Sequence, residues 1–377
     1  MTTTSSPDAL AAASGPARIA GPGEQISYDE LQLAARNHGI ALEAMAYDVT
    51  PAGLHYLLVH YDIPVLDPDS WRLRVGGHVE RPTELSLDAL RAMPARSVTV
   101  TFECAGNGRA RQEPRPQSQP WLVEAVGNAT WTGVPLRLLL ESAGLRDEAV
   151  DVVFTGADHG VERGVEQDYQ RGLPVSDALA DDVLVAYEMN GQPLPPQHGF
   201  PARLVVPGWY GMTQVKWLVG VDVRDTAFDG FQNAVAYRIR TGPDDPGEPV
   251  TRIEPRALLI PPGFPDFMSR TRVLQPGRCV VRGRAWSGWA PVTRVEFTAD
   301  DGATWADAEL DPPTSPDPYA WRGWRTEWEV GPGEHWLSAR AHDASGRVQP
   351  VLAAWNRGGF ANNSVQRVRV VCGAQPG

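Results

Sequence analysis

The pattern of apolar residues changes near residue 250, and this change limits the fold more than any other feature of the sequence. Before that point, alternating apolar runs are interspersed with segments that carry helix signals, which predicts a mixed α+β domain over residues 25–250. After it, the periodic segments all alternate with period two, and Asp301 and Gly302 form a hairpin signal between two of them. Short strands at this spacing predict an immunoglobulin-like β-sandwich over residues 251–374.

Three segments of the mixed domain carry helix start and stop signals. Ser27 begins a capping box, and Gly39 is the expected stop of that helix. Ser86 is the expected cap of a second short helix. Pro135 and Gly144 bracket a third, with proline in the first turn and glycine past the end.

Two segments look irregular. Residues 1–24 lack the basic and apolar parts of a signal peptide, and we interpret them as a disordered leader. Residues 241–267 are dense in proline and glycine, and we interpret them as a linker that wraps between the two domains.

The composition excludes several classes of partner. The 377 residues include 46 acidic and 34 basic side chains, a formal net charge of −12, which disfavours nucleic acids and anionic membranes. No apolar run reaches the length of about 18 residues that a transmembrane helix needs. The cysteines, Cys104, Cys279 and Cys372, are widely separated, which argues against a disulfide framework or a zinc ribbon. We therefore expect a cytoplasmic protein with reduced thiols.

Cys104 stands at the end of the predicted strand 97–103, directly before a glycine-rich turn and Arg109. Four roles are open: a buried small hydrophobic residue, a nucleophilic or redox thiol, a zinc ligand, and a lone thiolate ligand to a metal whose other ligands come from a cofactor. No base and no companion ligands at metal spacing lie nearby in the sequence. The fourth role needs a close approach, which Gly106 and Gly108 allow, and a cation that lowers the thiol pKa, which Arg109 supplies.

A second group of polar residues falls in the glycine- and proline-shaped segment 187–218. It brings His198, Arg203, Gln214 and Lys216 from loops. A neutral donor, a forked guanidinium and an ammonium group together suit a phosphate or another anion. The alternative is that His198 and Lys216 are solvated surface residues.

These segments resemble the sulfite oxidase family of molybdenum–molybdopterin enzymes, over most of residues 45–371. The stretch "CAGNGR" is similar to that family's CAGNRR loop, and 187–218 resembles its pterin-binding segment. Residues 66–94 are similar to its entry segment, and 284–305 and 348–363 to its dimerisation domain. The resemblance implies a mixed α/β molybdopterin domain followed by an immunoglobulin-like dimerisation domain.

The resemblance implies a role for each matching residue of the cofactor site. Cys104 would be the thiolate ligand of molybdenum. His198, Arg203, Lys216 and the backbone of Gln214 would hold the pterin and its phosphate.

Other positions match the family at greater distance along the chain. His60 falls at the histidine of the family's RNH motif, and Asp158 at a pterin-contacting aspartate. Tyr237, which follows His198 by 39 residues, corresponds to the active-site tyrosine, whereas Tyr169 matches no catalytic position. Trp121 corresponds to the tryptophan of the substrate pocket.

The arginines of the family's oxyanion pocket are only partly matched. Arg109 matches the first of three positions, and Leu58 stands where the RNH arginine is expected. Arg357 lies one position before the third, and Gly108 replaces a further arginine. A pocket with fewer fixed cations should hold a small dianion less tightly, which puts sulfite as the substrate in question.

The implied function is oxygen-atom transfer with Mo-molybdopterin, foremost the oxidation of sulfite to sulfate, with electrons passed to a separate acceptor. Three alternatives stay open: a related enzyme that reduces a sulfoxide or N-oxide or oxidises another sulfur compound, a non-catalytic pterin carrier, and a metal-free thiol enzyme. The C-terminal part implies a homodimer. Its tryptophans, Trp286, Trp289, Trp321 and Trp324, lie either at the dimer contact or, as is more usual, in the core.

Overall fold

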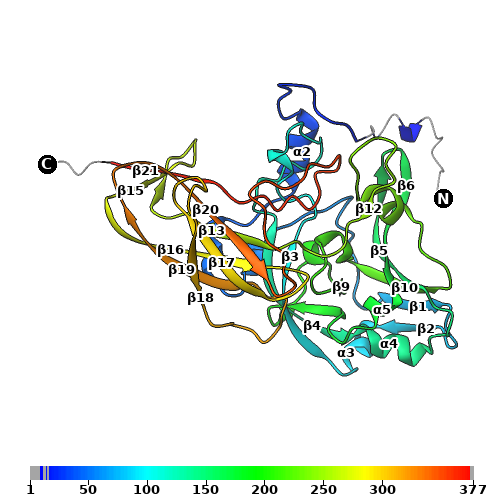
Figure 1. The fold of residues 1–377 in the computed structure, drawn as a ribbon. Helices are drawn as coiled ribbons and strands as arrows, with labels where there is room; N and C mark the ends of the chain where they lie inside the picture. Colours follow the sequence, from blue (N-terminus) through cyan, green and yellow to red (C-terminus); the bar gives the residue numbers. More distant parts are fainter. Residues whose placement is uncertain (1–8, 12–13, 15–16, 374–377) are drawn as a thin grey trace.

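The computed structural model describes residues 9–11, 14 and 17–373. Figure 1 shows two parts side by side, with the strands that follow residue 255 on the left and those of residues 72–224 on the right. Much of the predicted leader, residues 1–8, 12–13 and 15–16, lies outside the described residues. The leader contacts the body of the protein before residue 25, because Ala20 is buried and its N–H donates to the Arg115 carbonyl at 2.8 Å.

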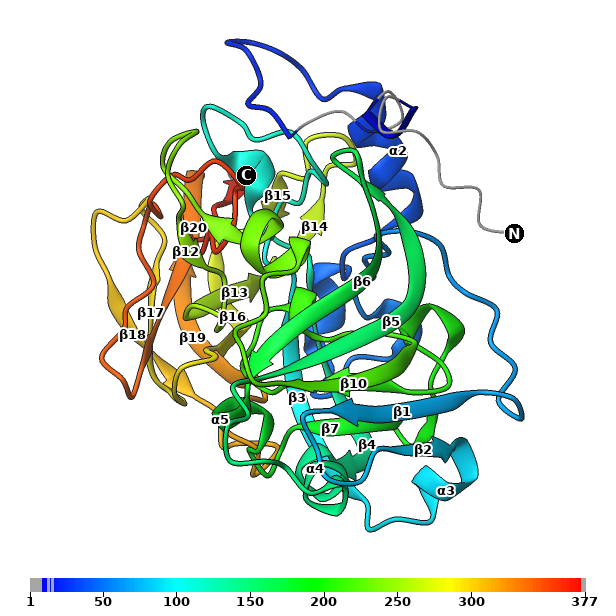
Figure 2. The same ribbon diagram turned by 90° about the vertical axis from the view of Figure 1, so that its right-hand side faces the viewer.

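Among the described residues, the mixed part contains two five-stranded sheets. Figure 2 shows the first of them, whose two longest strands, β5 (Asp151–Glu162) and β6 (Val165–Pro174), lie side by side towards one edge. Its order is β2 (Thr83–Ser86), β1 (Arg72–Gly77), β10 (Leu218–Arg224), β5 (Asp151–Glu162) and β6 (Val165–Pro174). The strands β1 and β10 are parallel, and the other neighbours are antiparallel.

The second sheet positions the functional residues. It consists of β3 (Arg96–Glu103), β4 (Val126–Pro135), β7 (Leu184–Met189) and β8 (Gln192–Pro193), with β9 (Arg203–Val205) paired to β7. Successive side chains of β3 point to opposite faces of the sheet. Because residues 100–103 are all buried, both faces of the sheet are covered at this end of the strand. Asn190 and Gly191, both at positive φ, form the tight turn between β7 and β8.

The predicted helices are present and begin where the sequence signals place them. The helix α2 (Tyr28–Arg36) has the capping box of Ser27, α3 (Leu87–Arg91) is capped by Ser86, and α4 (Leu136–Ala143) ends at Gly144. A fourth, α5 (Val175–Ala178), is a single turn. The expected stop at Gly39 was wrong: α2 ends at Arg36, and Gly39 is needed because a Cβ there would lie 2.5 Å from the Glu124 Cβ.

The C-terminal part is all strand, as predicted. Its nine-stranded path runs β13 (Arg256–Ile260), β16 (Gly277–Trp286), β19 (Arg322–Val330), β18 (Ala306–Leu310), β17 (Val292–Thr298), β20 (Gly333–Asp343), β21 (Val368–Cys372), β15 (Arg272–Leu274) and β14 (Phe264–Pro265). Asp301 and Gly302 lie at positive φ in the turn of the hairpin β17–β18, which confirms the hairpin signal. Because β13 also packs on β20, the sheet folds over a shared core.

The interpretation of 241–267 as a linker was wrong in part. Its residues 256–260 form β13, which pairs with β16 and is buried, and residues 248–249 form β12 (Glu248–Pro249), which pairs with β11 (Arg238–Ile239). The proline-rich flanks concealed a short apolar strand. The immunoglobulin-like classification of the sheet stays a prediction.

Three of the four tryptophans singled out in the sequence lie in the core. Trp286, Trp321 and Trp324 are at most 2% exposed, whereas Trp289 is 36% exposed. No helix among the described residues combines the length and apolar character needed to cross a membrane.

Candidate active site

A cavity lies at the ends of β3 and β9, between the two sheets of the mixed part. Its lining includes the predicted metal ligand Cys104 and the predicted tyrosine Tyr237. It also includes all the predicted cofactor-binding residues: His60, Asp158, His198, Arg203, Gln214 and Lys216. The structure therefore brings together residues that lie up to 177 positions apart in the sequence.

Cys104 directly follows β3 and is 6% exposed. Burial raises the pKa of its thiol, and the nearby Arg109 guanidinium opposes that rise without overcoming it. The indole of Trp121 also favours the ionised sulfur, although its N–H is buried without a well-aligned acceptor. Arg109 thus acts on the thiol pKa in the predicted direction, but in the protein alone burial dominates and the pKa lies above its ordinary value. A bound cation would be needed to hold the thiolate.

The glycines that follow Cys104 are required by the packing of the protein itself. A Cβ on Gly106 would lie 2.4 Å from the Arg109 guanidinium. Gly108 has φ +92°, and a Cβ there would lie 2.7 Å from the Asn362 carbonyl oxygen. These glycines thus let Arg109 fold back beneath the loop and let residues 362–363 pass over it.

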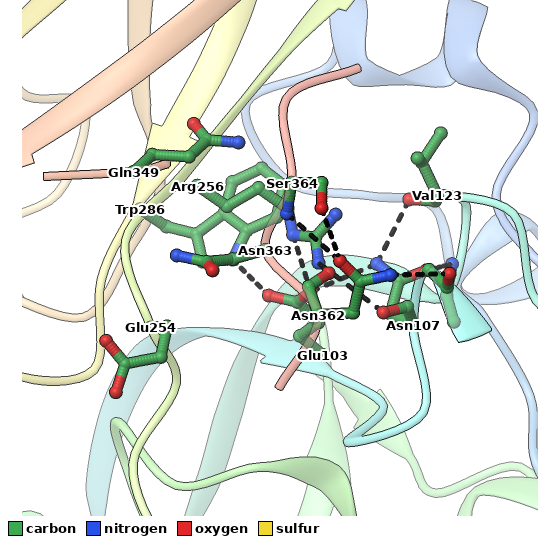
Figure 3. A network of polar contacts seen from close by, with 12 residues as sticks. Glu103, Asn107, Val123, Glu254, Arg256, Trp286, Gln349, Asn362, Asn363 and Ser364 are labelled. Carbon is green, nitrogen blue, oxygen red and sulfur yellow. Dashed lines mark hydrogen bonds and ion pairs between the residues drawn. The ribbon is translucent and has the colours of Figure 1, made fainter. Parts of the chain in front are cut away.

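A buried polar network ties the Cys104 loop to the C-terminal part (Figure 3). The Arg256 Nε lies 2.8 Å from the Glu103 Oε1, and both side chains are 1% exposed. The Trp286 indole donates to the other Glu103 oxygen at 2.7 Å, and the Asn107 amide donates to Oε1 at 3.1 Å. Arg256 also donates to the carbonyl of Asn362. The residue before Cys104 is thereby fixed by a strand and a loop of the other part of the chain.

At one end of the cavity, His198, Arg203 and Lys216 converge as the sequence predicted, and His198 and Arg203 are buried. The Arg203 guanidinium donates to the His198 and Gln214 carbonyls at 2.8 and 3.0 Å, and the Lys216 ammonium donates to the Leu58 carbonyl at 2.7 Å. Burial lowers the pKa of Arg203 to about 10, of Lys216 to about 7, and of His198 to about 2. His198 is therefore a neutral imidazole at pH 7, and the surface alternative for it was wrong.

Two further residues shape this end. Gln214 donates to the Val206 carbonyl at 2.7 Å and accepts from its N–H, so its side chain holds the loop in shape and leaves its backbone at the cavity. Asp158 is 6% exposed, and burial raises its pKa to about 6.

At the other end, Tyr237 and His60 form a hydrogen-bonded pair, with the hydroxyl oxygen 2.8 Å from the imidazole Nε2. Burial lowers the pKa of His60 to about 4 and raises that of Tyr237 far above its usual range. Neutral imidazole and neutral phenol therefore face each other at pH 7. Tyr169, which matched no catalytic position, also lines the cavity, with its ring centroid 4.8 Å from that of His60.

Three predicted residues do not border the cavity in the described part of the chain: Arg109, Trp121 and Arg357. Arg109 is 5% exposed and lies behind Cys104, where it donates to the Gly358 carbonyl at 2.8 Å and the Gln119 carbonyl at 3.0 Å. Arg357 is next in sequence to Gly358, and its backbone N–H donates to the Arg240 carbonyl at 2.8 Å.

His55 is a cavity residue that sequence reasoning missed. It is 2% exposed, its ring centroid lies 5.5 Å from that of His198, and its Nε2 has no hydrogen-bond partner among the described residues. Burial lowers its pKa to about 4. In the sequence His55 is flanked by the apolar stretch "GLHYLL", which carries no polar motif that would indicate a site.

The donor set fits a large anionic cofactor. Arg203 and Lys216 form no direct ion pair with a carboxylate among the described residues, although Asp158 acts on Lys216 from a greater distance. Arg203 is buried, and a buried cation without a counter-charge is costly. The orphaned His55 Nε2 likewise calls for a partner. No group of three or more His, Cys, Asp or Glu side chains is placed to hold a metal in the described residues. A metal at Cys104 would thus take its other ligands from a cofactor.

Comparisons with known proteins agree with this chemistry. The family model described as "Oxidoreductase molybdopterin binding domain" matches residues 60–232, and the one described as "Mo-co oxidoreductase dimerisation domain" matches residues 265–372. The boundaries predicted for the two domains, 25–250 and 251–374, stay a prediction.

Among curated proteins, the chain is 34% identical over 342 residues to the mitochondrial sulfite oxidase of Drosophila melanogaster, covering 85% of this chain and 59% of that protein. It is 32% identical over 352 residues to NADH nitrate reductase 1 of Oryza sativa subsp. japonica, covering 86% of this chain and 38% of that protein. The chain therefore spans less than two thirds of the length of these relatives.

Among solved structures, the sulfane dehydrogenase SoxCD from Paracoccus pantotrophus superposes with a TM-score of 0.76 at 26% identity, covering 94% of this chain and 92% of that one. The two family models, the curated relatives and the sulfane dehydrogenase all indicate the same family, and the cavity around Cys104 has side chains that suit the cofactor of that family. The chain belongs to the sulfite oxidase family of molybdopterin-dependent oxidoreductases, and its cofactor is Mo-molybdopterin.

Proposed function

We propose that this enzyme oxidises sulfite to sulfate and passes two electrons to a separate acceptor. The observation that carries the proposal is the cavity itself, in which the lone sulfur of Cys104 faces a neutral tyrosine–histidine pair with buried guanidinium groups behind them. The 34% identity to a sulfite oxidase supports the choice of substrate.

Within this proposal, the residues of the cavity divide into two sets. Cys104 is the protein ligand of molybdenum, and the remaining set holds the pterin and its phosphate: His60, Asp158, His198, Arg203, Gln214 and Lys216. Bound there, Mo-molybdopterin supplies a two-electron redox centre that exchanges an oxygen atom with the substrate. The donors from β9 and its neighbouring loops suit a phosphate because two cations converge there without a direct ion pair to a carboxylate of the described residues.

The overall reaction converts sulfite and one water into sulfate, two protons and two electrons. The protein's part is to place an anion and to stabilise its charge. Tyr237 offers a hydroxyl that His60 orients, and Arg109 contributes positive charge from behind Cys104. Trp121 packs beside the thiol. Arg357 does not border the cavity, and its part in binding the substrate is proposed because the carbonyl of its neighbour Gly358 accepts a hydrogen bond from Arg109.

The test is sulfite-dependent reduction of ferricyanide by protein produced with molybdate, with the molybdenum content measured on the same sample. Saturable turnover with two ferricyanide reduced per sulfite supports the proposal. Cys104→Ser should abolish turnover, whereas Cys279→Ser, which changes a half-buried thiol of β16, should not. A fully loaded enzyme without sulfite turnover would refute the proposal, and turnover retained in Cys104→Ser would refute the role of the thiol.

A second candidate is the oxidation of another reduced sulfur compound. Leu58 lines the cavity where the family resemblance leads one to expect an arginine, and the similar structure is that of a sulfane dehydrogenase. An apolar wall favours a less charged substrate. Faster turnover of a persulfide than of sulfite by the same loaded sample would favour this candidate. Loaded protein inert towards sulfur compounds, sulfoxides and N-oxides would instead indicate a pterin carrier.

We further propose that the enzyme is a homodimer that resides in the cytoplasm. The matched dimerisation domain supports the first statement, and the separated thiols support the second. A monomeric mass by light scattering at micromolar concentration would refute the dimer. Fractionation of cells would test the compartment.

A further inference from the structure

Arg171 is a buried arginine that the cofactor assignment leaves unused. It lies in β6 and is 3% exposed. No carboxylate of the described residues forms an ion pair with it, and its Nε has no hydrogen-bond partner among them. Burying an unpaired cation is unfavourable, so its presence requires a reason.

The side-chain hydrogen bond of Arg171 leads to Tyr237. Its Nη1 donates to the Gln232 carbonyl at 2.6 Å, and the same carbonyl accepts the backbone N–H of Tyr237 at 3.2 Å. Gln232 begins a single π-helical turn, η6 (Gln232–Ala236), and Tyr237 is the residue that follows it. The turn that carries the tyrosine is therefore fixed at its first residue by Arg171. π-Turns are otherwise rare and are frequent at functional sites.

The charge of Arg171 also faces the tyrosine. Its guanidinium carbon lies 5.6 Å from the centroid of the Tyr237 ring, whose hydroxyl is bonded to His60 on the cavity side. An acidic group of this region, Glu162, accepts a hydrogen bond from the Gln232 side-chain amide at 3.0 Å. Arg171 on β6 and Arg109 behind Cys104 both act electrostatically on Tyr237, and the Glu162 carboxylate opposes them. Both guanidinium groups are buried, and neither forms an ion pair with a carboxylate among the described residues.

We propose that Arg171 is a positioning residue of the substrate site: it holds Tyr237 in place through the Gln232 carbonyl and adds the positive charge that favours a doubly charged oxyanion. The inference rests on the proposed function. The charge of Arg171 would explain how the site selects anions although Leu58, which lines the cavity, is apolar. The charge acts across the tyrosine ring. For an effective dielectric constant of about 20, a unit charge about 12 Å from a singly charged anion changes its affinity about tenfold, and the effect on a doubly charged anion is larger.

The experiment compares Arg171→Met, Arg171→Lys and Tyr237→Phe, alone and combined, in the molybdenum-loaded enzyme. The first readout is the dissociation constant of sulfate, measured from the shift of thermal midpoint, with dimethyl sulfone as the uncharged probe. Arg171→Met should weaken sulfate binding by at least about tenfold, Arg171→Lys should retain most of the affinity, and binding of the uncharged probe should be unchanged in both. An unchanged sulfate affinity in Arg171→Met would overturn the inference.

A double-mutant cycle separates positioning from general stability. If Arg171 acts through Tyr237, then the loss of kcat caused by Arg171→Met should shrink in the Tyr237→Phe background, whereas equal factors in both backgrounds would overturn this route. The control is Arg284→Met, which removes another buried arginine. Arg284 lies in β16 of the C-terminal part and donates to the Met45 carbonyl at 2.8 Å. It should lower the thermal midpoint and leave sulfate affinity unchanged, and equal weakening in this control would refute a specific role for Arg171.

The sulfate readout does not depend on sulfite turnover. A wild-type enzyme that fails to oxidise sulfite but binds sulfate, and loses that binding in Arg171→Met, would refute the proposed substrate and support the role of Arg171. An enzyme that oxidises sulfite with unaltered sulfate affinity in Arg171→Met would do the reverse.

Discussion

Replacing Arg256 by methionine tests whether the Cys104 loop depends on the C-terminal part of the chain. The substitution leaves the Glu103 carboxylate buried without its cation, at a site where both side chains are 1% exposed and solvent cannot screen them. Breaking a buried ion pair costs about 3–5 kcal/mol, whereas exposed pairs are worth about 0–1 kcal/mol. Because Glu103 keeps the hydrogen bonds of Trp286 and Asn107, we expect the lower end of that range, about 3 kcal/mol.

The assay is chemical denaturation of Arg256→Met and wild type between pH 5 and pH 8. Burial already raises the pKa of Glu103, and losing Arg256 raises it further. A carboxyl group with a raised folded-state pKa binds more protons when folded, so the free energy of unfolding falls as the pH rises above its unfolded-state value of about 4.3. The deficit of Arg256→Met should therefore be larger at pH 8 than at pH 5.

Two further proteins make the test decisive. Arg325→Met makes the same change on β19, where an arginine side chain that is 44% exposed forms ion pairs with Glu309 and Asp311, and it should cost no more than about 1 kcal/mol. The double variant with Glu103→Gln removes the unpaired charge and should recover part of the loss. The reasoning fails if Arg256→Met costs no more than Arg325→Met, or if its deficit does not grow with pH.

Three other substitutions have defined outcomes. Tyr237→Phe removes the hydroxyl that lies 2.8 Å from the His60 Nε2. Because this hydroxyl is proposed to donate to the charged substrate, kcat/KM for sulfite should fall about tenfold, the loss expected for one hydrogen bond to a charged group. An unchanged kcat/KM would contradict the role of the hydroxyl. Burial and Arg203 lower the pKa of Lys216 to about 7, so the unfolded chain binds more protons than the folded one from there up to about pH 10.4. The stability of the cofactor-free protein relative to Lys216→Met should therefore rise across that window, and a flat difference in thermal midpoint would refute it. Gly108→Ala places a Cβ 2.7 Å from a carbonyl oxygen at a residue with φ +92°. It should lower the free energy of unfolding more than Gly191→Ala does, because Gly191 has φ +73° but open space around its Cβ. Equal losses in chemical denaturation would show that the loop adjusts freely.

The parts of the fold that the sequence predicted correctly are those with local signals. The caps of α2, α3 and α4 and the turn at Asp301–Gly302 depend on residues within a few positions of each other. The strand β13 was missed because its partners are distant. Its Ala257 and Leu259 N–H groups donate to the side chains of Gln349 and Gln366 at 2.7 and 2.8 Å. Nothing within residues 241–267 indicates such partners.

The same distinction holds for the site. The cofactor positions were found because the family resemblance fixes them by spacing, and the cavity contains every one. His55 and Arg171 were missed because their significance comes from contacts across the fold, with His198 and with Gln232. The thiol of Cys104 shows the limit of local charge counting: Arg109 lies beside it, yet burial decides the direction of its pKa.

The buried cations of this site indicate what kind of ligand it should bind. Arg109, Arg171 and Arg203 donate to backbone carbonyls of the chain, contacts that satisfy part of their hydrogen-bonding capacity but leave their charge uncompensated. Carboxylates in those places would stabilise the empty protein and would also neutralise the field at the cavity. With carbonyl partners, the neutralising charge must come from whatever anion binds. An anion that supplies it binds the folded state alone, so each such anion should raise the thermal midpoint in proportion to the logarithm of its concentration.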